Sequence, residues 1–180
     1  MPNNGKVSRD LHWYLRKYFA SHTTSGTKCE TKACAIYDEK GDVVDHKRGD
    51  RERFTKIVGG PEILVIQLVR ADWRYGHARK VKDRVQYPDR LDLSEYMRGD
   101  EDLLTYQLNG VVAHRGNTLN SGHYVAMVRS QRGDGFVLCD DIRIDDGRTK
   151  AEVLAQAESK EWQSYLLIYQ KIGGKMAKCI

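Results

Sequence analysis

The stretch "YQLNGVVAHRGNTLNSGHYVAMVRS", residues 106–130, decides the fold that this sequence predicts. Apolar residues recur on both sides of a polar, glycine-containing loop, which is typical of two strands joined by a connection. The segment "GFVLCDD", residues 135–141, follows a tight glycine-containing turn, so we expect neighbouring antiparallel strands. Side chains alternate along a strand, and His123 therefore shares a face with Val125 and Met127.

Other segments predict a helix and further strands. Helical spacing of apolar residues predicts a helix over residues 8–19, with Ser8 as its cap and one face buried. Residues 34–46 predict a hairpin around Gly41, because glycine tolerates the positive φ of such turns. The apolar run over residues 62–70 predicts a central strand that is covered on both faces.

The C-terminal part of the chain predicts one more helix and one more strand. Thr149 and Glu152 stand at capping-box spacing and predict a short surface helix. Residues 162–171 predict a last buried strand, and residues 173–180 predict a flexible tail. The expected architecture is α+β, built on an antiparallel sheet.

The composition is that of a single globular domain of ordinary size. The 180 residues are 40% hydrophobic and 31% charged, and the N-terminal segment has no apolar run of signal-peptide length. The longest uninterrupted apolar run, residues 165–169, is too short to cross a membrane. Four scattered cysteines indicate reduced thiols and a cytoplasmic or nuclear protein rather than a disulfide scaffold.

The net charge of +5 raises the question of a nucleic-acid partner. Basic residues gather most densely in residues 70–84, where Trp73 and Tyr75 lie among six Lys and Arg side chains. No nucleic-acid-binding motif accompanies this segment. We therefore favour a solvated connection between two strands and do not expect nucleic acid as a partner.

One histidine and two aspartates are the strongest candidates for chemistry. Asp140 lies seventeen residues after His123, and a tight hairpin would bring the two strand ends together. We expect Asp140 or Asp141 to face the imidazole, with a hydrogen bond to Asp140 of about 2.7 to 3.2 Å. A carboxylate beside an imidazole fixes its tautomer and stabilises its cation, as a general base requires. The alternative is a strand-end histidine with aspartates that cap a turn.

Together these segments resemble the ubiquitin-specific protease family, papain-like cysteine proteases that remove ubiquitin. The resemblance is carried by "YQLNGVVAHRGNTLNSGHYVAMVRS", "GFVLCDD" and "SYLLIYQK", with "GGPEILVIQLVR" and "VQYPDRLDLSEYM" in the family's order upstream. It implies a papain-like fold that is incomplete, mainly the antiparallel-sheet palm with part of the fingers. It also implies that residues 1–172 are the C-terminal part of the catalytic domain. Ubiquitin and ubiquitinated proteins would be its partners.

Carried over by position, the resemblance makes His123 the general base, Asp140 the residue that orients it and Asp141 a supporting polar residue. His114 matches a family position near the site, although a satisfied core histidine explains it equally well. The resemblance implies no cofactor. The residues that it assigns to the extended C-terminal tail of ubiquitin are Asn120, Ser121, Gly122 and Tyr124.

The family's cysteine box, a Gly-Asn-Thr-Cys sequence at the start of a helix, has no counterpart in this chain. The segment "GNTLNS" has Leu119 in place of the cysteine and lies in the loop before His123. Cys139 would point away from His123, because it precedes Asp140 in an extended strand. None of the four cysteines is expected at a helix N-terminus, where the helix dipole lowers a thiol pKa. We therefore expect the nucleophile to be missing from these residues.

Zinc is not expected either. The family's fingers often hold one zinc ion with two cysteine pairs, whereas this chain has only Cys29 and Cys34, separated by four residues instead of two. Half of a tetrahedral site binds the ion weakly, and His46 adds little. Free thiols are the interpretation that we favour.

Three functions remain open. The chain could be the C-terminal part of a deubiquitinase whose cysteine box was lost by truncation or splicing, a catalytically inactive ubiquitin-binding adaptor, or a nucleic-acid binder that uses residues 70–84. In the first case the missing half would normally cover one side of the sheet. We then expect an uncovered patch of apolar side chains from the strands and the first helix.

Overall fold

A computed structural model describes residues 9–74, 76–99, 104–118, 121–131, 135–157, 159 and 161–172. The chain divides into two compact units: the sheet unit, Met1–Tyr14 with Ile57–Ile180, and the hairpin unit, Leu15–Lys56. The expected tail, residues 173–180, lies outside the described residues. In the described part of the chain, no helix has the length and apolar character needed to span a bilayer.

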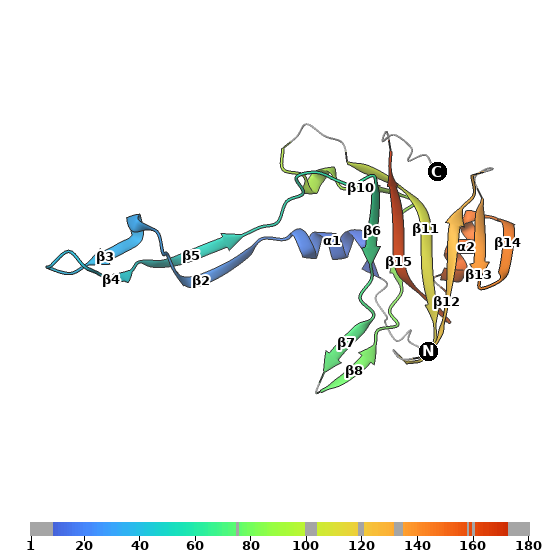
Figure 1. Cartoon of the computed structure of the whole chain (residues 1–180), viewed down its shortest axis with the longest axis horizontal. Helices are drawn as coiled ribbons and strands as arrows, with labels where there is room; N and C mark the ends of the chain where they lie inside the picture. The colour runs from blue at the N-terminus through green and yellow to red at the C-terminus, as the bar shows by residue number, and fades with distance from the viewer. Residues whose placement is uncertain are drawn as a thin grey trace, which may run out of the picture. The chain divides into compact units, whose positions relative to one another are not determined.

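The main sheet of the sheet unit has seven strands (Figure 1). They are β6 (Ile63–Gln67), β10 (Arg90–Asp92), β11 (Thr105–Arg115), β12 (His123–Arg129), β13 (Phe136–Asp140), β14 (Arg143–Arg148) and β15 (Trp162–Lys171). Their order is β14-β13-β12-β11-β15-β6, and β10 pairs with one end of β11. All of these pairings are antiparallel, which confirms the expected α+β architecture.

Smaller elements complete the sheet unit. Strands β1 (Arg9–Asp10) and β9 (Val85–Gln86) form a short parallel pair. Strands β7 (Ala71–Arg74) and β8 (His77–Lys80) form a hairpin. The remaining elements are the first turn of helix α1 (Leu11–Phe19), which continues into the hairpin unit from Leu15 on, the 3-10 turn η2 (Ser94–Tyr96) and helix α2 (Lys150–Ala157).

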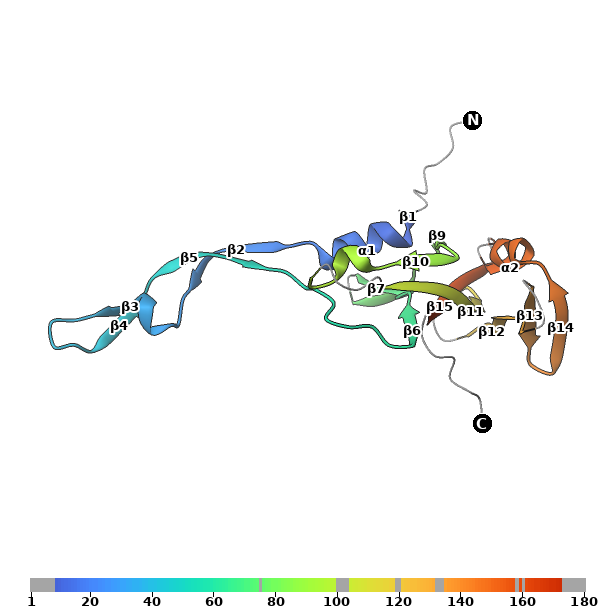
Figure 2. The same ribbon diagram turned by 90° about the horizontal axis from the view of Figure 1, so that it is seen from above.

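One face of the main sheet is buried. Helix α2 lies on this side of the strands and contacts β11, β13 and β15 (Figure 2). Val153 and Ala157 of α2 are 0% exposed. Burial of a large apolar side chain contributes about 1.5–3 kcal/mol, so this face holds most of the stabilising contacts. The strand residues that fill it are Tyr106, Leu108, Val111, Met127, Phe136, Leu167 and Tyr169.

The opposite face is not covered by the described residues. It presents exposed apolar side chains that include Val65 (54% exposed), Val128 (42%) and Ile144 (64%). Cross-strand pairs align them with further apolar residues, since Val65 pairs with Ile168 and Val128 pairs with Val137. The strands therefore contribute exposed apolar side chains to an uncovered face, as expected.

The prediction of a central strand covered on both faces over residues 62–70 is wrong. Strand β6 is the edge strand beside β15, and Ile63 is 44% exposed. The apolar run has no alternation that would mark one face as solvated. One of its two apolar faces lies on the uncovered side of the sheet, a fact that composition cannot reveal.

Helix α1 begins later than expected. Asp10 caps it, because the Trp13 N–H donates to Asp10 Oδ1 at 2.7 Å. The predicted cap, Ser8, lies outside the described residues. Only Leu11 is buried in this helix, and Tyr18 is 70% exposed, so the expected buried face is reduced to its first residue. A helical pattern shows which side is apolar but not whether anything packs on it.

The hairpin unit has paired strands and no buried residue. Its elements are β2 (His22–Lys28), the 3-10 turn η1 (Lys32–Cys34), β3 (Ala35–Tyr37), β4 (Val43–His46) and β5 (Arg48–Arg53). Strand β2 pairs with β5, and β3 pairs with β4. The predicted hairpin around Gly41 is confirmed, and Gly41 has a positive φ of 87°.

The capping box of α2 allows a test of the packing on the buried face. Glu152 accepts hydrogen bonds from the Thr149 N–H and hydroxyl at 2.8 and 2.9 Å, and its own N–H donates to Thr149 Oγ1 at 3.3 Å. Thr149→Ala should lower the free energy of unfolding by about 1 kcal/mol in a urea titration. The matched variant Thr149→Ser keeps the hydroxyl and should change it by less than about 0.5 kcal/mol. Equal stabilities of the Ala and Ser variants would show that this cap does not hold α2.

Candidate active site

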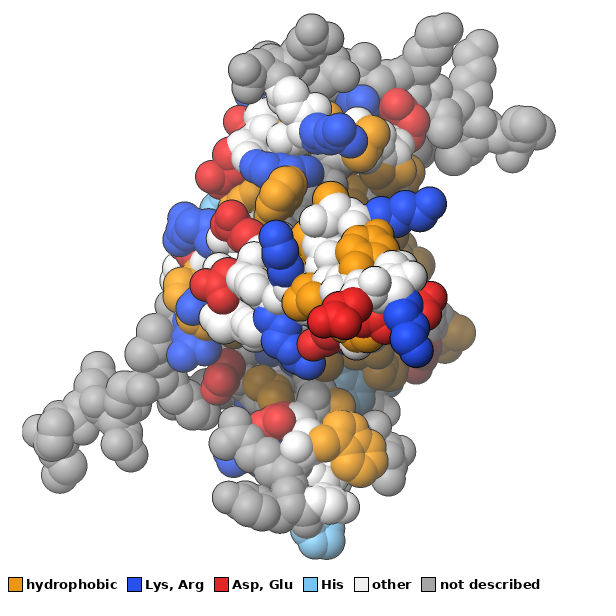
Figure 3. All heavy atoms as spheres, turned by 90° about the vertical axis from the view of Figure 1, so that its left-hand side faces the viewer, with side chains coloured by type: hydrophobic (Ala, Val, Ile, Leu, Met, Phe, Trp, Pro, Cys, Tyr) orange, Lys and Arg blue, Asp and Glu red, His pale blue; other side chains and the backbone are white. Residues whose placement is uncertain are grey.

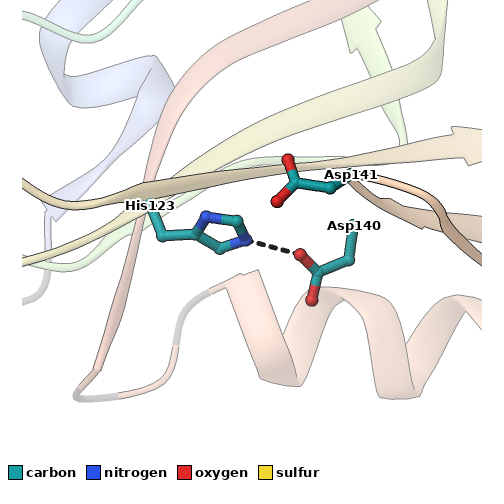
Figure 4. Close-up of side chains that lie close together, drawn as sticks. All are labelled: His123, Asp140 and Asp141. Carbon is teal, nitrogen blue, oxygen red and sulfur yellow. Dashed lines mark hydrogen bonds and ion pairs between the residues drawn. The ribbon is translucent and has the colours of Figure 1, made fainter.

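His123 and Asp140 meet where their strands end (Figure 4). His123 is the first residue of β12 and Asp140 the last residue of β13, and these strands are antiparallel neighbours. His123 Nε2 lies 2.5 Å from Asp140 Oδ1, so the expected contact is present and somewhat shorter than expected. The two side chains are 33% and 36% exposed, which leaves them accessible to a reactant.

Asp141 approaches the same imidazole from the turn after β13. Within the described residues it is the one non-glycine residue with a positive φ, 51°, a conformation that aspartate tolerates. Its carboxylate points back toward His123 (Figure 4). Ligand atoms of His123, Asp140 and Asp141 all lie within 4.8 Å of one another. Such a set could hold a cation, but two carboxylates beside a histidine equally well orient the ring and stabilise its protonated form.

The Trp162 ring lies beside the His123 imidazole. Its ring centroid is 6.2 Å from the imidazole centroid in an edge arrangement, and the residue is only 8% exposed. The Arg115 guanidinium lies 5.0 Å from the Trp162 ring centroid. Arg115 pairs with His123 on one side and with Trp162 on the other. Sequence reasoning missed Trp162, because only the pairing of β11 with β15 brings it to the site.

Two glycines allow the loop before His123 to lie against β11. A Cβ on Gly122 would overlap the Arg115 carbonyl oxygen and the His114 ring. A Cβ on Gly116 would lie 2.9 Å from the Gly122 Cα. Only glycine permits so close an approach of backbone to backbone, so the two residues fix the path of the loop.

The remaining predicted ligand residues lie in or beside this loop. The Ser121 N–H donates to Thr118 Oγ1 at 3.2 Å, and the two hydroxyl oxygens are 2.9 Å apart. Tyr124 is the second residue of β12 and is 52% exposed. Asn120 lies outside the described residues, as does Leu119, so its contact with a substrate stays a prediction.

A buried lysine and histidine, a pair that sequence reasoning missed, hold the start of the loop. Lys80 Nζ lies 2.6 Å from His114 Nδ1 and donates to the Gly116 carbonyl at 2.7 Å. Lys80 is 9% and His114 6% exposed. Burial and then the Lys80 charge lower the pKa of His114, and burial is also the main cause that lowers the pKa of Lys80. His114 is therefore a neutral acceptor at Nδ1, which agrees with a satisfied core histidine.

A pocket of about 160 Å³ lies beside this pair. Its wall includes Gln67, His114, Tyr124 and Tyr165. The Tyr124 ring centroid is 4.5 Å from that of His114 and 5.8 Å from that of Tyr165. Tyr124 shares its face of β12 with Ala126 and Val128, so the pocket lies on the uncovered side of the sheet.

Cys139 faces away from His123, as expected. It pairs with Ala126 of β12 and with Ile144 of β14, and therefore lies on the uncovered face. Cys29 and Cys34 belong to the hairpin unit, and Cys179 lies outside the described residues. Among the described residues of the sheet unit, the structure thus brings no thiol to the imidazole.

The basic segment, residues 70–84, is partly buried. Arg70 is 7% exposed and donates to the Ser164 carbonyl at 2.8 Å and to the Asp83 carbonyl at 2.6 Å. Lys80 is bonded to His114 and is equally unavailable to a phosphate. The burial of Arg70 and Lys80 weakens the interpretation of this segment as a phosphate-binding patch. Elsewhere, on the face drawn in Figure 3, Lys and Arg side chains are interspersed with Asp and Glu.

A family model and the related proteins found by sequence comparison point to the same family. A family model described as ubiquitin carboxyl-terminal hydrolase matches residues 8–169. Ubiquitin carboxyl-terminal hydrolase 10 of Saccharomyces cerevisiae is 33% identical over 141 residues, 77% of this chain and 17% of that protein. Ubiquitin carboxyl-terminal hydrolase 4 of Arabidopsis thaliana is 31% identical over 131 residues, 69% of this chain and 35% of that protein. The chain thus spans only a minor part of these relatives.

Solved structures share the fold. A chain of the SAGA Ubp8/Sgf11/Sus1/Sgf73 DUB module bound to ubiquitin aldehyde gives a TM-score of 0.68 at 23% identity, over 95% of this chain and 35% of that chain. A chain of the Ubp8-Sgf11-Sgf73-Sus1 SAGA DUB module gives 0.61 at 23% identity, over 92% of this chain and 32% of that chain. The expected papain-like protease fold, represented in part, is confirmed.

The lowered pKa of His114 predicts that acid destabilises the fold. Above pH 6.5, the ordinary histidine pKa, His114 is neutral in both the folded and the unfolded chain. Below pH 6.5 the unfolded chain binds a proton that folded His114 does not, so the free energy of unfolding falls until the folded pKa is reached. His114→Gln cannot titrate and should flatten this part of the profile in urea titrations. Parallel profiles for the two proteins between about pH 5 and pH 7 would contradict the assignment.

Proposed function

The chain belongs to the ubiquitin carboxyl-terminal hydrolase family, and we propose that it supplies the histidine and aspartate of a cysteine-type deubiquitinase whose thiol lies on another segment. The contact of His123 with Asp140 carries this proposal. It has the form of a general base with its orienting carboxylate, and both groups remain accessible.

The proposed reaction is hydrolysis of the bond between the C-terminal carbonyl of ubiquitin and a lysine amine. His123 takes the proton of the cysteine thiol, the thiolate attacks the carbonyl, and His123 returns the proton to the leaving amine. Water then hydrolyses the thioester after giving a proton to the same imidazole. Asp140 orients the ring in both steps, and Asp141 adds a second negative charge that stabilises the imidazolium.

A separate cysteine-box segment is the proposed source of the nucleophile. Cys139 is the described thiol nearest in sequence to the site, and its position on the other face of the sheet argues against it. Cys29 precedes a three-residue 3-10 turn of the hairpin unit and Cys34 ends it, so neither begins an α-helix, unlike the family's nucleophile. A fourth candidate, Cys179, lies outside the described residues.

The uncovered face of the sheet supports the idea of a missing segment. Val65, Val128 and Ile144 are exposed on strands β6, β12 and β14 of the sheet, and each pairs with an apolar residue of an adjacent strand. Contiguous apolar surface of this kind marks an interaction site more often than a free surface. A segment of the missing half that packs on this face would cover it, whereas the cysteine itself must approach His123 from the other face.

The C-terminal tail of ubiquitin is the proposed ligand of the pocket beside Tyr124. An extended tail that ends in two glycines needs little room, because it has no side chains there to clash with the walls. The pocket of about 160 Å³ is small, and Tyr124, Tyr165 and His114 give it flat aromatic sides. Ser121 and Asn120 would contact the backbone of the tail from the adjoining loop, and Gly122 would lie against it.

A catalytically inactive ubiquitin-binding adaptor is the second candidate. The orientation of Cys139 away from His123 favours it, because binding through the Tyr124 pocket needs no thiol. The two candidates differ in whether a cysteine-box segment restores a reaction.

The isolated chain should not react with a ubiquitin probe that carries a thiol-reactive group at its C-terminus. Addition of the cysteine-box segment of a family member, as a separate polypeptide, should produce labelling of that segment and cleavage of a fluorogenic ubiquitin conjugate. His123→Ala should then lower the rate of cleavage by about 10²- to 10⁴-fold, because it removes the general base. The control variant His22→Ala replaces an exposed histidine of the hairpin unit and should leave the rate unchanged.

Two other results would change the assignment. Labelling of the isolated chain at one of its own cysteines that is lost in His123→Ala would show that the nucleophile lies within these residues. Binding of ubiquitin without any reaction after addition of the segment would favour the adaptor function.

Substitution of the two aspartates should distinguish orientation from general negative charge. Asp140→Asn should lower the rate of the reconstituted reaction by about 10²- to 10⁴-fold, because the amide cannot hold the imidazole in the required tautomer. Asp141→Asn should lower it by less than about tenfold, since it removes only a supporting charge. The measurement is the rate of cleavage of the fluorogenic conjugate over a range of pH. Losses of equal size would assign the orienting role to both residues together.

A further inference from the structure

Cys34 is the last residue of the turn η1 in the hairpin unit, Cys29 precedes this turn, and the backbone holds the two residues together. Both are bonded to one residue of the opposite segment. The Cys29 N–H donates to the Lys47 carbonyl at 3.0 Å, and the Lys47 N–H donates to the Cys34 carbonyl at 2.7 Å. The Cys34 N–H also donates to the Thr31 carbonyl at 2.9 Å, which tightens the turn. The two cysteines cannot separate unless these main-chain bonds break.

The Cys29 thiol is in a polar setting. Cys29 Sγ lies 3.2 Å from Thr31 Oγ1, and the Cys34 side chain is near enough to influence the pKa of Cys29. Interaction with the Cys34 side chain first, and then with Thr31, lowers the pKa of the Cys29 thiol from 9.0 to about 7. A large fraction of Cys29 is therefore thiolate, the nucleophilic form, at neutral pH. Both cysteines are only half-buried, so a small reagent can reach them.

A crosslink would stabilise the hairpin unit. None of its residues, 15–56, is buried, so it has no apolar core of its own. Small structures without a core are usually held by disulfides or a structural metal. A bond between Cys29 and Cys34 would close the turn that joins the strand pair β2–β5 to the strand pair β3–β4.

We propose that Cys29 and Cys34 form a redox-active dithiol that peroxides convert into an intramolecular disulfide. The Cys29 thiolate attacks one oxygen of the peroxide, the O–O bond breaks, and the other oxygen leaves as hydroxide, or alkoxide from an organic peroxide. The Cys34 sulfur then attacks the resulting sulfenic acid, its thiol proton joins the departing hydroxyl, and water leaves. Two electrons pass from the two sulfur atoms to the peroxide.

The same pair is a poor metal site. A tetrahedral zinc site needs four ligands, and two thiolates supply half of them. In the described part of the chain, one group of three possible metal ligands has its ligand atoms close together. It consists of His123, Asp140 and Asp141. Neither cysteine of the hairpin unit belongs to such a group, so their proximity points to each other as partners.

Peroxide treatment of the 180-residue chain followed by peptide mapping tests the proposal. The experiment uses the Cys179→Ser background, so that a cysteine outside the described residues cannot take part. A small molar excess of hydrogen peroxide should produce a peptide in which Cys29 and Cys34 are joined, while Cys139 stays free to react with iodoacetamide. Cys34→Ser should stop the reaction at the sulfenic acid of Cys29, which dimedone traps. The control Cys139→Ser should not change the yield of the disulfide.

Thr31→Val tests the source of the reactivity. It removes the hydroxyl beside Cys29 Sγ and should raise the pKa of that thiol. If the pKa rises from about 7 to about 8, the thiolate fraction at pH 7 falls about fivefold, and the rate of iodoacetamide alkylation falls with it. Three results would overturn the proposal: both cysteines stay reduced under peroxide, Cys139 oxidises first, or one zinc ion binds through the pair and blocks oxidation.

Discussion

The long strand β11 is the constraint on which the rest of the structure depends. It pairs with β12 on one side and with β15 on the other, and its first residues also pair with β10. Through these ladders Arg115 lies beside both His123 and Trp162, and His114 lies beside Tyr124. Because side chains alternate along a strand, a slip of one residue would move each of these groups to the other face. The register that forms the core therefore also forms the candidate site.

Sequence patterns predicted the elements whose stability comes from one covered face. Strands β11, β12, β13 and β15 lie where alternation of apolar residues indicates, and the meeting of His123 with Asp140 follows from their order. Patterns failed where the outcome depends on what packs on a face, as for the edge strand β6 and for Tyr18 in α1. Strands β2, β5 and β14 are mostly polar and exposed, so their pairing rests on backbone hydrogen bonds that leave little signal in side-chain composition.

The sequence predicted those contacts of the candidate site that join residues close in sequence. It did not predict the contacts between residues far apart in sequence. Lys80 lies 34 residues before His114, and only the packing of β8 near the loop brings their side chains together. The result is two histidines with opposite partners on neighbouring strands. His123 is accessible and faces a carboxylate, which orients its ring. His114 is buried against an ammonium, which keeps it neutral and makes it a fixed part of the loop.

The two faces of the sheet have different proposed roles: one holds the core and the candidate catalytic pair, and the other binds partners. His123 and Asp140 stand on the side of Val125 and Leu138, so the core fixes their positions. The Tyr124 pocket opens on the other side, together with the exposed apolar side chains of β6 and β12. A segment packed on that side would cover these side chains and border the pocket in one step. In the proposed enzyme, binding of a segment on that face would therefore stabilise the folded chain by mass action and complete the channel for the ubiquitin tail, while the cysteine must approach His123 from the face of Val125 and Leu138.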